Sequence, residues 1–313
     1  MMISRRIFLL LVSLCSLIMF VHGQTEAQRK AIAITIDDLP LNGPNIPVRN
    51  LEIMTSSILD ALRKHDAPAV GFVNESLLFI DGQTDLRISL LRSWVDAGVE
   101  LGNHTYAHVG FRDTPLEKYE DDFVRGDAVT AKLQKKSARY FRHPFLQMGP
   151  TRDIELAFEK FIEARGCRIA PITISTEDWM FLAAYQKAKM SADEREMKKV
   201  SDEYLRFAQA ALEYREKASD KLFGRQISQI LLLHANEVTS ANMDRLLQMY
   251  KDHGYRFVTL ESALKDPSYS LPPNYTATSD WLQHWATSKG EKLEGPTPPE
   301  FIQKAYADAQ SAK

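Results

Sequence analysis

Two short polar clusters, each following an apolar run, combine residue types that hold a metal ion. Asp37 and Asp38 come directly after the β-prone stretch 31–36, where a strand would end in a loop. Because neighbouring residues that leave a strand point in different directions, one carboxylate can bind a cation while the other accepts a proton. His104 and His108 are four residues apart, which predicts two imidazoles on one face of a helical turn. Two histidines and one carboxylate are a common ligand set for catalytic zinc.

Apolar strand-like runs alternate with amphipathic segments over most of the chain. The pattern predicts strands at 31–36, 69–73, 99–102, 139–142, 168–174, 227–233 and 255–260, and helices at 51–62, 90–94, 115–136, 152–165 and 240–253. Repeated βα units predict a parallel sheet. Polar residues at the carboxyl ends of about seven strands favour a barrel, which makes the expected class α/β.

Two segments interrupt this alternation. The charged stretch 190–221 carries apolar residues three and four positions apart, which predicts an inserted amphipathic helix. Packing on the barrel as core cover is the favoured interpretation over a lid or a partner-binding role. The proline-rich segment after the last predicted strand has little periodicity, so we predict a C-terminal arm, residues 266–313, wrapped over the barrel. Its expected anchors are Trp281, Leu282 and Trp285.

Length and composition set limits on the function. The chain has 313 residues, 44% of them hydrophobic, which is enough for one large domain or two small ones. Its formal charge of -2 and pI near 6.5 give no electrostatic reason to expect a nucleic-acid partner. One of the two cysteines, Cys15, lies in the N-terminal apolar run, so Cys167 alone is expected in the mature protein, without an intramolecular disulfide.

The N-terminus has the features of an export signal. Arg5 and Arg6 precede the apolar run 7–21, and Gly23 precedes Gln24 as at a signal-peptidase site. We therefore expect a signal peptide over 1–23, a barrel domain over 24–265 and a periplasmic or secreted protein. The residues around the two arginines also resemble a twin-arginine signal. An uncleaved segment would instead be the protein's one membrane attachment.

Three further polar groups stand where predicted strands end, namely 142–145, 176–179 and His234. Taken in order with the paired aspartates and the two histidines, they resemble the five motifs of the polysaccharide deacetylases, the NodB-homology group or carbohydrate esterase family four. The resemblance runs from about residue 31 to residue 260. It implies a distorted (β/α)7 barrel, in agreement with the strand count.

The resemblance also implies roles for individual residues. The metal ligands, usually of zinc although another divalent metal is possible, would be Asp38, His104 and His108. The residues assigned to catalysis are Asp37 as the base, Arg142 to orient that base, His234 as the general acid, Asp178 to tune that histidine, and the backbone N–H of Phe145 at the oxyanion. His143 and His284 are expected to be structural.

Several positions depart from the family pattern. Ile36 replaces an aromatic residue, Leu39 and Pro40 follow the aspartates where Gly is frequent, and Ser175 replaces an Asp. Phe145 is not followed directly by Gly, and Ala235 and Asn236 follow the histidine where Asp is frequent. None of these changes removes an expected ligand, base or acid. They affect the residues expected to contact the sugar.

The leading hypothesis is an exported, metal-dependent enzyme that hydrolyses N-acetyl groups of a glycan, such as chitin oligomers or peptidoglycan. An O-acetyl esterase acting on xylan is the near alternative. A non-catalytic glycan-binding protein of the cell envelope is a third hypothesis, although such a protein would tolerate loss of the base and the acid, and both are present.

Overall fold

The structure is a computed structural model, and it describes residues 30–41, 48–272 and 280–311. The predicted signal peptide therefore lies outside the described residues. Within the described ranges, no helix is both long enough and apolar enough to cross a membrane.

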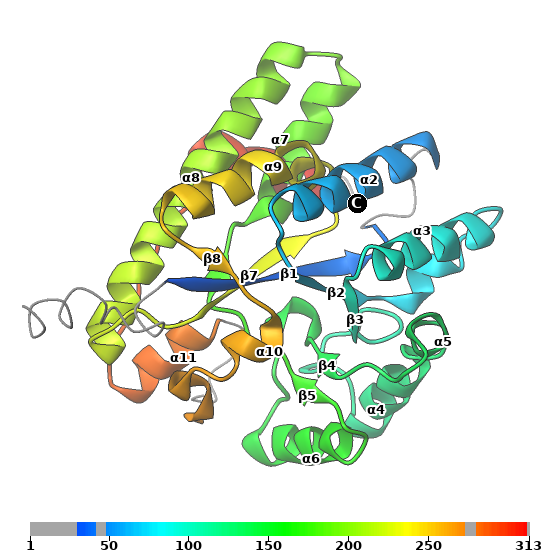
Figure 1. Ribbon diagram of the computed structural model, residues 1–313, viewed down its shortest axis with the longest axis vertical. Coiled ribbons are helices and arrows are strands. Elements are labelled where there is room, and N and C mark those ends of the chain that lie inside the picture. The colour runs from blue at the N-terminus through cyan, green and yellow to red at the C-terminus, as the bar shows by residue number, and fades with distance from the viewer. Residues whose placement is uncertain (1–29, 42–47, 273–279, 312–313) are drawn as a thin grey trace, which may run out of the picture.

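Among the described residues, eight parallel strands form the centre of the molecule (Figure 1). They are β1 (Ala31–Leu39), β2 (Ala69–Val73), β3 (Glu100–Asn103), β4 (Tyr140–Phe141), β5 (Arg168–Ile169), β6 (Ile174–Ser175), β7 (Gln229–His234) and β8 (Arg256–Phe257). Seven of them pair in the order β5-β4-β3-β2-β1-β7-β6, and β8 pairs with β1. All nine residues of β1 are buried, as expected for a central strand covered on both faces. This arrangement confirms the predicted α/β class and the distorted (β/α)7 barrel.

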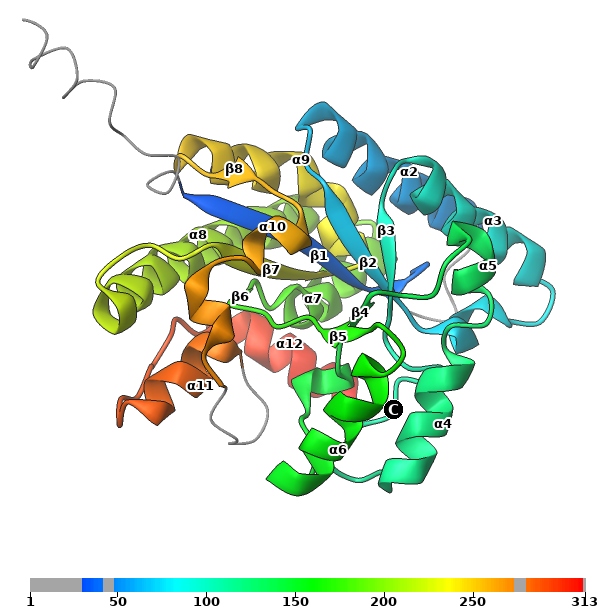
Figure 2. The ribbon, with the colours of Figure 1, turned by 60° about the horizontal axis from the view of Figure 1, so that its bottom comes forward.

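The helices surround the sheet (Figure 2). They are α2 (Val48–Lys64), α3 (Thr84–Asp96), α4 (Leu116–Arg125), α5 (Thr130–Gln134), α6 (Arg152–Glu163), α7 (Asp178–Met190), α8 (Glu194–Phe223), α9 (Glu237–Asp252), α10 (Leu260–Ala263), α11 (Trp281–Ser288) and α12 (Glu300–Ser311). Helices are present at the predicted 51–62, 90–94, 152–165 and 240–253, but the predicted helix 115–136 is wrong in one respect, because it is two helices, Leu116–Arg125 and Thr130–Gln134. Short 3-10 turns are η2 (Glu75–Leu78), η3 (Pro144–Leu146) and η4 (Pro267–Ser270).

The predicted strand 168–174 is wrong in one respect, because it is two strands that pair with different neighbours. The N–H of Ala170 donates to Phe141 on β4, at 2.7 Å, whereas the N–H of Thr173 donates to Ile230 on β7, at 2.9 Å. Pro171 stands between them and has no N–H to donate. The chain therefore changes partner here, and the barrel has a seam between β5 and β6.

The insert and the arm both pack on this framework. α8 buries an apolar face that includes Val200, Tyr204 and Phe207 in the main core, so the predicted amphipathic helix is confirmed as core cover. In the arm, Leu282 and Trp285 are buried against Leu222 and Ile227. The arm also contains two helices, α11 and α12, that its weak periodicity did not predict.

Helix α4 positions the loop that carries the two histidines. A Cβ on Gly126, at the end of α4, would lie 2.7 Å from the backbone carbon of Thr105 and 2.8 Å from the nitrogen of Tyr106. The N–H of Tyr106 also donates to Asp122 on α4, at 3.0 Å. The loop therefore approaches the helix end so closely that only glycine fits.

We expect Gly126→Ala to lower the free energy of unfolding by about 1–3 kcal/mol, the usual cost of overpacking. The change should also weaken binding of a metal by the neighbouring histidines, because the displaced backbone is the segment between them. Urea unfolding and a metal titration measure the two effects.

Ala97 provides a matched control, because it ends α3 with nearly the same backbone angles, φ -80° and ψ 0°, as Gly126, φ -75° and ψ 7°. Ala97→Gly should cost about 0.5–1 kcal/mol and leave metal affinity unchanged. Equal metal affinity in Gly126→Ala and the wild type would contradict the packing argument.

Candidate active site and metal site

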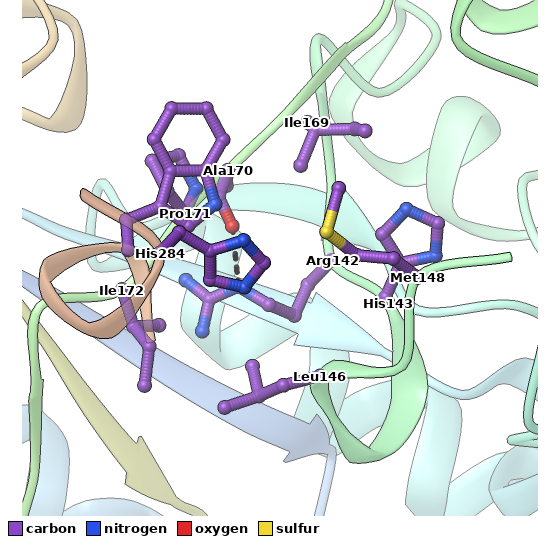
Figure 3. Close-up of a pocket in the computed structure, with 10 residues that line it drawn as sticks. Arg142, His143, Leu146, Met148, Ile169, Ala170, Pro171, Ile172 and His284 are labelled. Carbon is purple, nitrogen blue, oxygen red and sulfur yellow. Dashed lines mark hydrogen bonds between the residues drawn. The ribbon is translucent and has the colours of Figure 1, made fainter. Parts of the chain in front are cut away.

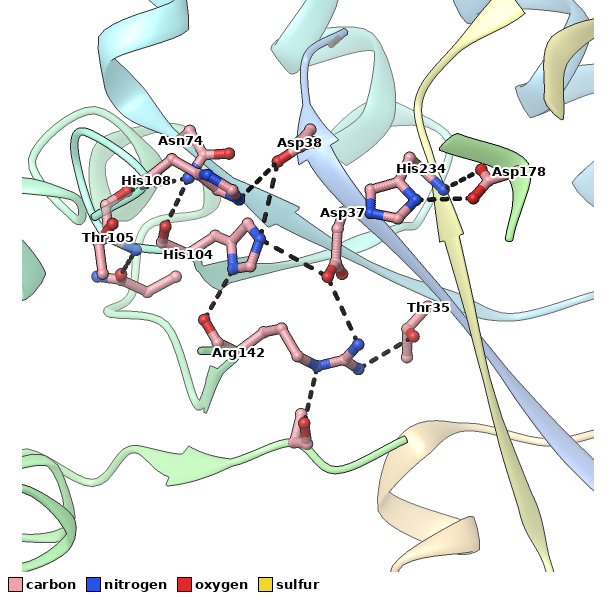
Figure 4. A network of polar contacts seen from close by, with 12 residues as sticks. Thr35, Asp37, Asp38, Asn74, His104, Thr105, His108, Arg142, Asp178 and His234 are labelled. Carbon is pink, nitrogen blue, oxygen red and sulfur yellow. Dashed lines mark hydrogen bonds and ion pairs between the residues drawn. The ribbon is translucent and has the colours of Figure 1, made fainter. Parts of the chain in front are cut away.

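The carboxyl ends of neighbouring strands bring the predicted site residues together (Figure 4). β1 and β7 pair in a register that sets Asp37 opposite His234. His104 directly follows β3, and Arg142 directly follows β4. Parallel strands end at one edge of the sheet, which explains how residues about 200 positions apart in the chain meet there.

Asp38, His104 and His108 each turn one ligand atom toward a common point, and the three atoms lie within 4.8 Å of one another. Oδ1 of Asp38 is 3.7 Å from Nε2 of His104 and 3.5 Å from Nε2 of His108. A tetrahedral zinc ion at about 2.0–2.2 Å from each ligand holds its donors roughly 3.3–3.6 Å apart. The two imidazoles and the carboxylate therefore fit a divalent metal in both chemistry and spacing.

The two histidines do not lie on a helical turn, so that prediction is wrong. They belong to a loop in which Thr105 and His108 have positive φ, 60° and 56°. Asn103 fixes the loop, because its Oδ1 accepts from the N–H of Thr105 at 2.8 Å. Asn74, at the end of β2, donates to the carbonyl of His104 at 2.5 Å. The sequence analysis did not select Asn74, and the signal that would have found it is a polar residue directly after a predicted strand.

His104 is held in the form that a metal requires. Its Nδ1 lies 2.7 Å from the carbonyl oxygen of Arg142, which assigns the proton to Nδ1 and leaves Nε2 free to bind a cation. Burial and the neighbouring His108 hold the pKa of His104 well below its usual value. At neutral pH the His104 imidazole is therefore uncharged, and its Nε2 can bind a cation.

Asp37 lies beside the ligands but has a different environment. It is 2% exposed, and its Oδ2 lies 3.5 Å from Nη1 of Arg142 and 3.6 Å from Nε2 of His104. Its other oxygen, Oδ1, is buried without a hydrogen-bond partner among the described residues. Burial raises the pKa of Asp37 to about 6, although Arg142 opposes the rise. A carboxylate with an unused oxygen and a raised pKa is suited to take a proton.

Arg142 is fixed in place from three directions. Its Nε donates to the carbonyl of Ala170 at 2.7 Å, and its Nη2 donates to Oγ1 of Thr35 at 3.1 Å. Its guanidinium also lies 4.7 Å from the centre of the Phe72 ring. Ala170 belongs to the seam between β5 and β6, so the change of strand partner there supplies one of the groups that orient Arg142.

His234 forms a second charged pair with Asp178. Its Nδ1 is 2.8 Å from Oδ1 of Asp178, and its backbone N–H donates to Oδ2 at 2.7 Å. Asn236 and Thr239 also donate to this carboxylate, at 3.0 Å and 2.8 Å. Burial lowers the pKa of His234, but the charge and hydrogen bond of Asp178, together with the charges of Asp38 and Asp37, outweigh it, and the pKa rises to about 10. His234 is therefore protonated at neutral pH and can donate a proton from Nε2.

Phe145 lies at the rim, 59% exposed, with its ring edge-on to His108 at 4.5 Å. Its φ is 56°, a strained value for a residue other than glycine. His143, buried next to it, is 2.9 Å from the hydroxyl of Tyr119 and 3.2 Å from Glu155. Glu155 in turn accepts from the N–H of Gly149 at 2.6 Å. This buried network holds the loop whose Phe145 N–H is predicted to face the oxyanion, a role that stays a prediction.

These residues surround a cavity of about 580 Å³. Six of the predicted groups line it, namely Asp37, Asp38, His104, His108, Phe145 and His234, whereas Arg142 and Asp178 lie behind them. The lining also includes Trp179, and Arg215, Asp280 and Tyr306 from the insert and the arm, where no sequence motif indicated chemistry. A second cavity of about 30 Å³ lies between Arg142 and the arm residues Trp281 and His284 (Figure 3). It has room for about one or two water molecules.

Comparison with known proteins agrees with this geometry. Residues 24–157 match the family model of the polysaccharide deacetylases. This range of the chain contains Asp37, Asp38, both loop histidines and Arg142. This part of the chain, residues 24–157, is therefore similar to the polysaccharide deacetylase family. The family is one of hydrolases that act on N-acetyl groups. The matched range ends before Asp178 and His234, whose predicted pairing is seen in the structure.

Three relatives illustrate the likeness. A peptidoglycan-N-acetylglucosamine deacetylase of Bacillus cereus is 22% identical over 153 residues, which are 49% of this chain and 48% of the relative. The chain thus matches about half the length of that protein. The solved structure of BA3943, a carbohydrate esterase family 4 pseudoenzyme from Bacillus anthracis, is 19% identical and superposes with a TM-score of 0.53 over 76% of this chain and 66% of that one. The polysaccharide deacetylase Bc1974 from Bacillus cereus is 19% identical and superposes with a TM-score of 0.52 over 74% of this chain and 92% of that one. At these identities the structures support the fold.

The ligand geometry leads to a direct prediction. The purified protein should bind one divalent metal, and His104→Ala/His108→Ala should lose it because a single carboxylate remains. Metal analysis after dialysis, with circular dichroism as a check on folding, measures this. His253→Ala, which changes a histidine outside the site, is the control and should retain the metal. Full metal content in the double variant would show that the cation binds elsewhere.

Proposed function

We propose that the protein is an exported, divalent-metal-dependent deacetylase that hydrolyses N-acetyl groups of an N-acetylglucosamine-containing glycan of the peptidoglycan or chitin-oligomer type. One observation carries this proposal: a buried base, Asp37, lies between the ligand triad and the protonated His234, so a base and an acid flank one point (Figure 4). The activity for which the Bacillus cereus relative is named supports the N-acetylglucosamine substrate. The export signal in the sequence supports the location.

An acetamide needs both groups, because its carbonyl is a poor electrophile and its amine is a poor leaving group. The divalent cation held by Asp38, His104 and His108 would supply Lewis-acid polarisation of the carbonyl and acidify a water. Asp37 accepts a proton from the attacking water as the new C–O bond forms. Arg142 keeps the Asp37 carboxylate in place during this transfer.

The second half of the reaction breaks the C–N bond. In this mechanism the backbone N–H of Phe145 donates a hydrogen bond to the developing oxyanion. His234 donates its Nε2 proton to the departing nitrogen, and the Asp178 carboxylate stabilises the protonated form until that moment. The products are acetate and the free amine, and both catalytic groups return to their starting states by exchanging a proton with solvent.

Catalysis is not implied by the fold alone, because BA3943 shares the fold and is described as a pseudoenzyme. The proposal therefore depends on the polar groups and not on the superposition. In this chain the base contacts its arginine and the acid contacts its carboxylate, which a protein that only binds glycans does not require.

The decisive experiment measures acetate release from N-acetylglucosamine oligomers and from peptidoglycan. We expect release that a chelator stops and a divalent metal restores. Asp37→Asn should retain the metal and the fold yet lose about two to four powers of ten in turnover, the usual contribution of a positioned base. Activity within a few-fold of the wild type in this variant would exclude Asp37 as the base.

The pH dependence tests the acid separately. Because only protonated His234 can donate, kcat/KM should fall as the pH rises through about 10. Asp178→Asn removes the charge that raises this pKa, so the basic limb should move to lower pH by about one to three units. The limb is measured from initial rates across pH 5 to 11. An unmoved limb would mean that another group supplies the proton.

A further inference from the structure

One wall of the catalytic cavity is built by segments outside the barrel. Arg215 comes from α8, Asp280 is the residue that caps α11, Tyr306 lies on α12, and Trp179 lies in the first turn of α7. We call these four residues the arm wall. α12 packs against α7, and α11 packs against α8, as Figure 2 shows. Three of the four residues thus come from the insert and the arm, and Trp179 comes from α7.

Arg215 and Asp280 form a fixed, neutral pair. Nη2 of Arg215 is 2.6 Å and Nη1 is 3.1 Å from the two carboxylate oxygens, and both side chains are largely buried. Asp280 also accepts from the N–H of Gln283 at 2.9 Å. Because the two charges cancel, the pair offers donors and acceptors without attracting an anion. Neutral hydroxyl groups are the ligand chemistry that matches it.

Trp179 and Tyr306 add aromatic surface beside this pair. Their rings meet edge-on, with centroids 4.8 Å apart, and both are partly exposed to the cavity. An aromatic face packs against an apolar face, and a nearby polar group fixes the orientation of a ligand that has both. A sugar ring has this combination, with C–H groups on its faces and hydroxyls at its edge.

We propose that the arm wall is a second sugar subsite, which binds the ring next to the one that loses its acetyl group. This inference rests on the proposed function and names the substrate class more closely, as an N-acetylated oligosaccharide of at least two rings. The cavity volume of about 580 Å³ falls within the range of about 300–1,000 Å³ for sites that enclose small ligands. Catalytic groups come from the barrel, whereas selection for chain length comes from Arg215, Asp280 and Tyr306.

Binding to a protein that cannot turn over tests the subsite. In the Asp37→Asn background loaded with metal, calorimetry measures the affinity for N-acetylglucosamine and for its trimer. Adding Tyr306→Ala should weaken trimer binding about five- to tenfold, the contribution of one stacking contact, and should change monosaccharide binding less than twofold. Tyr306→Phe retains the ring and should bind the trimer as the background does.

Lys304→Ala is the matched control on α12, because Lys304 pairs with Asp308 on the exposed side of the same helix. It should leave both affinities unchanged, and thermal melting verifies that each variant is folded. Equal trimer affinity in Tyr306→Ala and its background, or an equal loss for the monosaccharide and the trimer, would overturn the subsite. If the background bound neither saccharide, the proposed glycan substrate itself would fail, and the subsite with it.

Discussion

The contact between the buried carboxylate of Asp37 and the buried guanidinium of Arg142 is the interaction on which the site depends. Neither charge is stable alone at this depth, and removing one partner from such a pair typically costs about 3–5 kcal/mol. Arg142 also orients His104 through its carbonyl and is held by Ala170 at the barrel seam. A single residue therefore connects the base, a metal ligand and the irregular part of the sheet, so changes in any of these should affect the others.

Backbone strain is concentrated at the same place. Among the described residues, the non-glycine positions with positive φ at the site are Asp38, Thr105, His108, Phe145, Leu146 and Glu177. Each costs of order 1–3 kcal/mol and persists only where surrounding contacts fix it. At the histidine loop those contacts are the side chains of Asn74 and Asn103 and the close approach of Gly126. The strain turns the ligand atoms inward, at positions that regular helix or strand geometry would not reach.

This strain explains which parts of the molecule the sequence could predict. Strands such as 69–73 and helices such as 152–165 follow hydrophobic periodicity, and the structure has both within about two residues. The histidine loop was mistaken for a helical turn because its conformation depends on the side chains of Asn74 and Asn103 and on the close approach of Gly126, none of which periodicity reports. Likewise 168–174 is mostly apolar, and only the pairing partners reveal that it is two strands. Residue identity indicated the chemistry, whereas its exact placement came from contacts distant in sequence.

The seam between β5 and β6 also explains why the arm contributes to the site. Because β5 and β6 do not pair with each other, their facing edges have backbone N–H and C=O groups that need other partners. The N–H of Trp281 supplies one by donating to the carbonyl of Ile172, at 2.9 Å, within the seam. This bond places the start of α11, and with it Asp280, at the cavity. A segment needed to cover the open side of the barrel is thereby in position to contact the substrate, so its side chains can change specificity without disturbing the catalytic groups on the strands.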